Sequence, residues 1–96
     1  MKIQQAATTE DLKRNYEVMK VLRPHHSLES FLITIEQMFK EGYRLIYLED
    51  NNRVVCVAGY RFTTTLYDGL MIDFDDFVTL EDERGKGYAG QLFDHL

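Results

Sequence analysis

The chain has 96 residues, 45% of them hydrophobic and 28% charged, which limits it to a single compact domain. Its formal net charge of -5 argues against nucleic acid as a partner, because binding to a phosphate backbone needs a basic face. No apolar run could span a bilayer and the N-terminus lacks the apolar core of a signal peptide, so we expect no membrane association and a cytoplasmic location.

The first 42 residues predict a short strand followed by two helices. Residues 2–7 favour a strand, and Thr8 then begins a helix, with Asp11 three positions later in a capping-box pattern. Ser27 is placed to cap a second helix, and Gly42 to end it, because glycine readily adopts the left-handed conformation found after helices. The apolar residues of this second helix recur at helical spacing: Leu28, Phe31, Leu32, Ile35, Met38 and Phe39.

Three strands rich in β-branched and aromatic residues follow, at 43–48, 53–65 and 70–80. The segments between them, 50–52 and 67–69, contain the asparagine, aspartate and glycine residues of tight turns. We therefore expect an antiparallel meander.

The middle strand is apolar at every position of 54–58, which is typical of a central strand covered on both faces, here by helices. Cys56, the only cysteine, lies inside this run and can form no internal disulfide. We interpret it as a small buried hydrophobe and not as a nucleophile, because no feature places a base beside it.

The last strand contains an irregularity at Asp76. Before it, apolar residues alternate with others along Leu70, Met71, Ile72, Asp73, Phe74 and Asp75. Asp76 then falls where the core face should be, and residues 77–80 no longer keep the earlier parity. Two interpretations stay open: an extra residue, which is a β-bulge, or a strand that ends at Asp75.

A glycine-rich loop follows this strand and leads into a third helical pattern. The loop runs through Arg84, Gly85, Lys86, Gly87, Tyr88, Ala89 and Gly90, and the helical spacing involves Ala89, Leu92, Phe93 and Leu96. The order of strand, glycine-rich loop and helix is typical of phosphate-binding sites, because the first amides of a helix lack internal acceptors. The loop matches neither the Walker A sequence nor the dinucleotide fingerprint.

The loop resembles the pyrophosphate loop of the GNAT acyl-CoA N-acyltransferases, Gln/Arg-x-x-Gly-x-Gly/Ala, at Arg84, Gly87 and Ala89. The order of strand, two helices, three antiparallel strands, loop and helix is also similar to that family along the whole chain. The resemblance implies an α+β fold in which residues 1–96 form one truncated acyltransferase domain, ending inside the helix after the loop.

The resemblance also implies a function: transfer of the acetyl group of acetyl-CoA, the co-substrate, to a primary amine of an acceptor, without a metal. In such a site the loop amides hold the pyrophosphate, the strand before the loop pairs with pantetheine, and a bulge opens the sheet for the thioester. The cofactor-binding residues implied are Phe77, Val78, Thr79, Arg84, Gly85, Lys86, Gly87, Tyr88 and Ala89.

The catalytic groups are less well defined. Candidates for a general base are Asp73, Asp75 and Asp76, although the family register places Met71 at one base position, and a solvated strand face is the alternative for such carboxylates. The tyrosine acid of the family lies in elements beyond Leu96.

Several alternatives accompany this prediction. An unpaired edge of the last strand favours a homodimer. A catalytically inactive CoA-binding or protein-interaction module on the same scaffold is the second functional class.

A metal site built from Asp73, Asp75, Asp76 and the acidic residues 81–83 is disfavoured, since calcium needs a tighter cage of oxygen atoms. His25 and His26 are expected as exposed loop residues, and the strand aromatics Tyr60, Phe62 and Tyr67 as packing residues or as the lining of an acceptor pocket.

Overall fold

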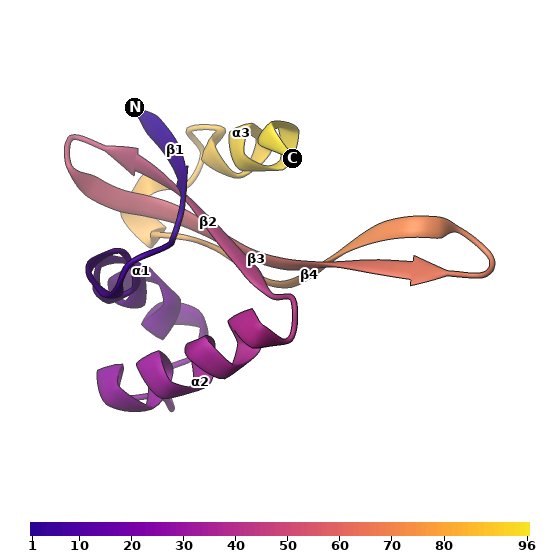
Figure 1. The fold of residues 1–96 in the computed structure, drawn as a ribbon. Helices are drawn as coiled ribbons and strands as arrows, with labels where there is room; N and C mark the ends of the chain where they lie inside the picture. Colours follow the sequence, from indigo (N-terminus) through magenta and orange to yellow (C-terminus); the bar gives the residue numbers. More distant parts are fainter.

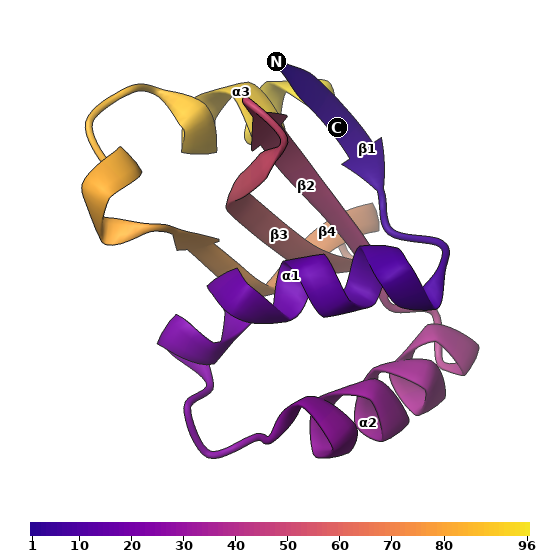
Figure 2. The same cartoon turned by 90° about the vertical axis from the view of Figure 1, so that its left-hand side faces the viewer.

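A computed structural model describes residues 1–96 as a four-stranded antiparallel sheet with helices on both faces (Figure 1). The strands follow one another in the order β1-β2-β3-β4, and α1 and α2 lie on one side while α3 lies on the other (Figure 2). The predicted α+β order is therefore confirmed, with element ends that differ by one or two residues. In chain order the elements are β1 (Lys2–Gln5), α1 (Thr9–Leu22), α2 (Leu28–Lys40), β2 (Arg44–Asp50), β3 (Arg53–Thr65), β4 (Gly69–Thr79), the 3₁₀ helix η1 (Glu81–Glu83) and α3 (Tyr88–His95).

Both predicted helix caps are present. The Thr8 hydroxyl accepts a hydrogen bond from the Asp11 N–H at 3.1 Å, and the Asp11 carboxylate accepts one from the Thr8 N–H at 3.2 Å, which completes the capping box. The Ser27 hydroxyl accepts from the Ser30 N–H at 3.1 Å at the start of α2. After α2 the chain turns at Gly42, whose φ of 94° would strain any residue with a Cβ.

The turns place β2, β3 and β4 as the predicted meander. Asn51 and Asn52 both have positive φ, 52° and 63°, and join β2 to β3 in a two-residue turn whose twist matches that of the strands. Gly69 begins β4 with a φ of 72°.

The sheet carries a hydrophobic core on each face. The larger core lies under α1 and α2 and includes Val57 and Val78, while the smaller lies under α3 and includes Cys56 and Leu92. β3 contributes to both cores, which confirms its central position. Cys56 is fully buried, and its burial raises the pKa of the thiol, as expected for a structural residue.

β4 contains the bulge that the sequence left open. Gly59 is opposite Asp76 while Tyr60 is opposite Phe74, so Asp75 is the extra residue, and the strand continues beyond it to Thr79. The interpretation in which the strand ends at Asp75 is wrong. The bulge keeps Asp76 on the face covered by α1, where its carboxylate reaches Arg23, directly after α1, and Tyr43, directly before β2.

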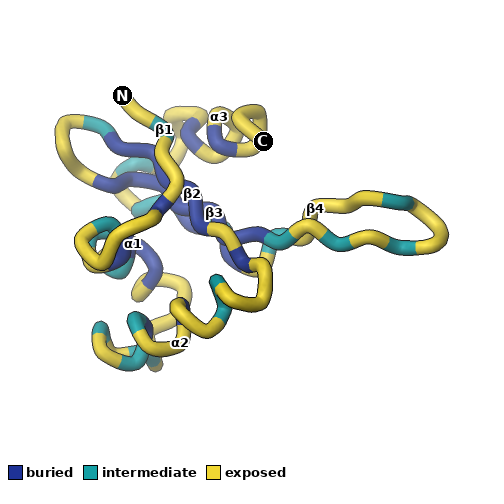
Figure 3. The backbone as a smooth tube through the Cα atoms, in the orientation of Figure 1, coloured by how far each residue is buried: buried dark blue, intermediate teal, exposed yellow.

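Beyond the bulge, β3 and β4 leave the body of the molecule as a long hairpin, which we call the arm (residues 61–74) (Figure 1; Figure 3). The change is abrupt in β3, where residues 54–60 are all buried and residues 61–65 alternate between half-buried and exposed. Met71 and Asp73 both lie on this arm.

Candidate functional site

The glycine-rich loop has the backbone geometry of a helix N-terminus that is open to a ligand. After η1, Gly85 and Gly87 take φ values of 84° and 80°, and Gly87 is the N-cap of α3 without a side chain to occupy the first amides. A Cβ at either glycine would meet no atom within 4 Å, so the space above the loop is open. The need for glycine here comes from φ and not from crowding.

The backbone N–H groups of residues 85–90 make no hydrogen bond within the structure. The first bond to an acceptor at this end of α3 is from the Gln91 N–H to the Gly87 carbonyl at 3.1 Å, and no side chain caps the helix. Six consecutive donors without a partner in the chain therefore lie at the positive end of the helix dipole, and this arrangement suits an anion with several acceptor oxygens.

Charged side chains surround this loop but leave its amides free. The Lys86 ammonium donates to the Glu83 carboxylate at 2.9 Å, which raises the pKa of the lysine and keeps it charged. Arg84 donates from Nε to the Thr79 carbonyl at 3.3 Å, and so links the loop to the end of β4. Arg53 pairs with Asp82 at 3.1 Å and partly offsets the acidic turn.

α3 is held against the sheet by Tyr88 and Leu92. Leu92 is fully buried, and the Tyr88 hydroxyl donates to the Asp50 carboxylate at 3.1 Å. The predicted apolar stripe is only partly correct, because Phe93 is 59% exposed and rests on Phe74 at the edge of the core. Tyr88, a predicted loop residue, thus anchors the helix through its side chain, and only its backbone N–H is free.

β4 is an edge strand, and its outer edge includes two of the three predicted pantetheine-binding residues. The Leu80 N–H donates to the Val55 carbonyl at 3.0 Å. Because antiparallel pairing alternates, Val78 also bonds toward β3, and the N–H and C=O groups of Phe77 and Thr79 point outward. Val78 contributes its buried side chain to the core under α1.

The three candidate carboxylates occupy different surroundings. Asp73 is on the arm and accepts a hydrogen bond from the Thr63 hydroxyl at 2.7 Å. Asp75 is exposed at the bulge and forms an ion pair with Arg61 at 2.7 Å through Oδ2. No hydrogen bond in the structure uses its other oxygen, Oδ1. Asp75 therefore lies at the bulge with one carboxylate oxygen free to accept a hydrogen bond.

Asp76 is 6% exposed and both of its oxygens are engaged. Arg23, at the end of α1, donates from Nε to Oδ1 at 3.0 Å, and the Tyr43 hydroxyl donates to Oδ2 at 2.7 Å. Burial and the bond to Asp76 raise the pKa of Tyr43 far above its ordinary value, so the phenol stays protonated as the donor. This carboxylate fastens α1 and β2 to the bulge and is poorly placed to accept a proton.

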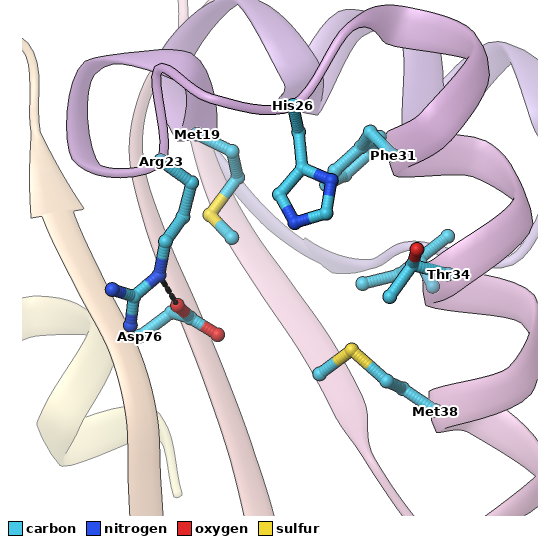
Figure 4. Close-up of a pocket in the computed structure, with 8 residues that line it drawn as sticks. Met19, Arg23, His26, Phe31, Thr34, Met38 and Asp76 are labelled. Carbon is cyan, nitrogen blue, oxygen red and sulfur yellow. Dashed lines mark hydrogen bonds and ion pairs between the residues drawn. The ribbon is translucent and has the colours of Figure 1, made fainter.

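A pocket of about 90 Å³ lies beside this ion pair, between α1, α2 and β4 (Figure 4). Its walls are mostly apolar, with Met19 and Met38 on opposite sides and the Arg23–Asp76 pair at one end. His26 lines it too, and its ring Nδ1 lies 2.8 Å from the Ser30 hydroxyl, so this histidine is more involved in local structure than an exposed loop residue.

Sequence reasoning missed Arg23 and Tyr43. Nothing in the sequence near either residue indicates Asp76, which is 53 and 33 positions away, so only the tertiary structure reveals this network. The structure contains no group of three or more His, Cys, Asp or Glu side chains placed to hold a metal ion. None of its helices has the length and apolar content needed to cross a bilayer.

The arrangement of elements is that of the GNAT acetyltransferases: solved structures of that class superpose on almost the whole chain, which establishes the fold. A GNAT family acetyltransferase from Staphylococcus aureus is 15% identical, with a TM-score of 0.83 over 98% of this chain and 73% of its own. The aminoglycoside antibiotic 6'-N-acetyltransferase AAC(6')-IG from Acinetobacter haemolyticus is 16% identical, with a TM-score of 0.78 over 99% of this chain and 68% of its own.

A third structure, AAC(6')-Iy in complex with the bisubstrate analogue CoA-S-monomethyl-acetylneamine, is 18% identical, with a TM-score of 0.80. It covers 98% of this chain, which in turn covers 67% of AAC(6')-Iy. No protein-family model and no curated protein sequence matches the chain. The likeness is therefore one of structure, at identities too low to transfer a substrate.

Proposed function

We propose that residues 1–96 form one acyl-CoA N-acyltransferase domain that transfers the acetyl group of acetyl-CoA to a primary amine. The observation that carries this proposal is the run of six free N–H groups, 85–90, at the start of α3. A diphosphate bridge presents enough acceptor oxygens to use them, and its negative charge suits the helix dipole. Arg84 and Lys86 add positive charge beside the same amides.

In this proposal β4 supports the extended arm of the co-substrate. The outward N–H and C=O groups of Phe77 and Thr79 would pair with the pantetheine amides as an added strand does. The Thr79 carbonyl now accepts from Arg84, so binding requires that guanidinium to turn toward the phosphates. The bulge at Asp75 then separates the paired part of β4 from the region where the thioester would lie.

The proposed reaction is direct aminolysis. The acceptor nitrogen attacks the thioester carbonyl carbon, a C–N bond forms, the C–S bond breaks, and the thiolate leaves and is protonated. The nitrogen loses a proton, and Asp75 is the carboxylate best placed to accept it, because one of its oxygens is free at the bulge. Asp75→Asn should therefore lower kcat in an assay of thiol release, whereas Asp73→Asn on the arm should not.

The test of the binding site compares Gly87→Asp with Gly87→Asn. Both side chains have the same shape and tolerate the left-handed conformation that Gly87 adopts, so the pair differs mainly in charge. A negative charge about 4 Å from a phosphate costs about 1 kcal/mol in water and about 4 kcal/mol at an effective dielectric constant of 20. Calorimetric titration with acetyl-CoA should thus show affinity at least about fivefold weaker for Asp than for Asn.

Equal affinity of the two variants for acetyl-CoA would refute the proposal that this loop binds the pyrophosphate. Binding of acetyl-CoA without release of thiol, across a panel of small cationic amines, would instead support the inactive CoA-binding module. One feature favours that second candidate: both oxygens of Asp76 already accept hydrogen bonds from the protein. The most buried carboxylate of the site therefore has no oxygen left to accept a proton from a substrate.

A further inference from the structure

Arg84 connects the two parts of the proposed acetyl-CoA site, the outer edge of β4 and the amides of residues 85–90. Its Nε donates to the Thr79 carbonyl at 3.3 Å, on the edge where the pantetheine amides would pair. Its backbone N–H donates to the Glu81 carbonyl at 3.4 Å, so η1 fixes the point from which the side chain reaches back to β4. The guanidinium therefore occupies an acceptor that an added strand would use.

Thr79 is held in place on the other side, by β3. It lies opposite Cys56, and its hydroxyl oxygen is 3.2 Å from the buried Cys56 sulfur. The next residue, Leu80, donates its N–H to the Val55 carbonyl at 3.0 Å. These contacts keep the Thr79 carbonyl directed away from β3. A pantetheine N–H can take the place of the guanidinium on this oxygen only when Arg84 moves.

Arg84 differs from the other cationic side chains beside the loop in having no carboxylate partner. Lys86 and Arg53 both form ion pairs with Glu83, at 2.9 and 3.6 Å. The only hydrogen bond of the Arg84 side chain is the one to the Thr79 carbonyl, a neutral acceptor. A hydrogen bond between two charged groups is about twice as strong as one between neutral groups. A phosphate anion therefore draws Arg84 away from its present partner more easily than it draws Lys86 from Glu83.

We propose, on the basis of the function proposed above, that Arg84 makes the site specific for thioesters that carry a diphosphate. A diphosphate on the amides of residues 85–90 binds the guanidinium, and the vacated Thr79 carbonyl then accepts a hydrogen bond from the pantetheine arm. A pantetheine thioester without a diphosphate has to displace Arg84 without offering it a new partner. Such a thioester loses the phosphate contacts and, in addition, pays for the broken bond between Arg84 and Thr79.

The two halves of acetyl-CoA should therefore assist each other when they are supplied as separate molecules. One half is inorganic pyrophosphate. The other, which we call the pantetheine fragment, is S-acetyl-N-(N-acetyl-β-alanyl)cysteamine, which keeps the thioester and both amides but is too short to reach the phosphates. Each should raise the affinity for the other by the same factor. The fragment is uncharged, so attraction between the two ligands does not produce this effect. One hydrogen bond from a charged group corresponds to a factor of about ten.

Titrations followed by NMR of the backbone amides separate the two binding events by residue. The signals of Phe77 and Thr79 report on the pantetheine fragment, and those of Gly85 and Gly87 report on pyrophosphate. The wild-type chain should bind the fragment about tenfold more tightly with saturating pyrophosphate than without it. Arg84→Met keeps the stem of the exposed side chain and removes the guanidinium. In this variant the fragment should bind at the higher affinity from the start, and pyrophosphate should change that affinity little.

Lys86→Met is the matched control, because it removes one positive charge from the same loop at a side chain that bonds to Glu83 and not to β4. It should weaken the binding of pyrophosphate, as Arg84→Met does. The affinity for the pantetheine fragment should stay at its wild-type value, and saturating pyrophosphate should still raise it about tenfold. Only Arg84→Met should thus weaken the binding of intact acetyl-CoA while it strengthens the binding of the fragment.

The outcomes distinguish this inference from the proposed function. If the wild-type chain binds both halves but its affinity for the fragment is the same with and without pyrophosphate, Arg84 does not couple them, and the proposed function stands. The same coupling in Arg84→Met as in wild type, or no detectable binding of the fragment in either chain under both conditions, would also overturn the role of Arg84. No binding of acetyl-CoA and pyrophosphate at the loop would overturn the proposed function, and the role of Arg84 with it.

Discussion

The contact between Gly59 and Tyr43 yields a sharp prediction about the bulge. A Cβ built on Gly59 would lie 1.6 Å from the Tyr43 hydroxyl oxygen and 2.3 Å from Cζ, so Gly59→Ala forces the tyrosine ring to move. The ring passes over Gly59 to reach Asp76, and any displacement breaks the 2.7 Å hydrogen bond between them.

The expected loss of stability has two sources. Overpacking at a buried position costs about 1 to 3 kcal/mol. The Asp76 oxygen left without its donor costs about 1 to 3 kcal/mol more, because Asp76 is buried. A total of about 2 to 6 kcal/mol should lower the melting temperature of a 96-residue domain by at least about 8 °C.

Urea and thermal denaturation measure this loss of stability. Two control variants show whether it comes from the contact between Gly59 and Tyr43. Gly90→Ala is the same chemical change in α3, where an added Cβ meets nothing within 4 Å, and it should stabilise the chain by about 0.5 to 1 kcal/mol. In a Tyr43→Leu background, which lacks the ring, Gly59→Ala should cost much less. If Gly59→Ala cost the same in both backgrounds, or less than about 1 kcal/mol, the assignment of this contact would be refuted.

Three further predictions concern the network and the caps. Hydrogen bonds from backbone N–H groups lower the pKa of Asp11 below its ordinary 3.8, so Asp11→Asn should destabilise the chain above that pH, and the difference from wild type should disappear as acid titration passes through the lowered pKa. Arg23→Met should cost about 1 to 3 kcal/mol in urea denaturation because it takes one of two donors from the buried Asp76 carboxylate, whereas Arg61→Met, whose partner Asp75 is exposed, should cost no more than about 1 kcal/mol. Ser27→Ala should cost about 1 kcal/mol by removing the cap of α2, and an unchanged melting temperature would show that the cap is dispensable.

The sequence by itself determined the features that depend on neighbouring residues. The capping box of Thr8, the cap at Ser27, the stop at Gly42 and the asparagine turn between β2 and β3 are local hydrogen-bond and φ preferences, and all of them are present. The loop before α3 belongs to the same class, because its two glycines with positive φ and its uncapped first turn follow from composition. The order of elements was therefore predictable, and with it the GNAT fold.

Only the tertiary structure decided what depends on residues far apart in the chain. Alternation in β4 left the bulge undecided, and the pairing with Gly59 places the extra residue at Asp75. The hydrogen bonds of Asp76 depend on Arg23 and Tyr43. No spacing in the sequence shows that these two residues lie next to it. The strand pattern also predicted residues 61–74 as ordinary sheet, whereas the helices cover only the body and leave the arm exposed. Whether a strand is buried depends on the elements that pack on it, so the sequence of the strand alone does not determine its burial.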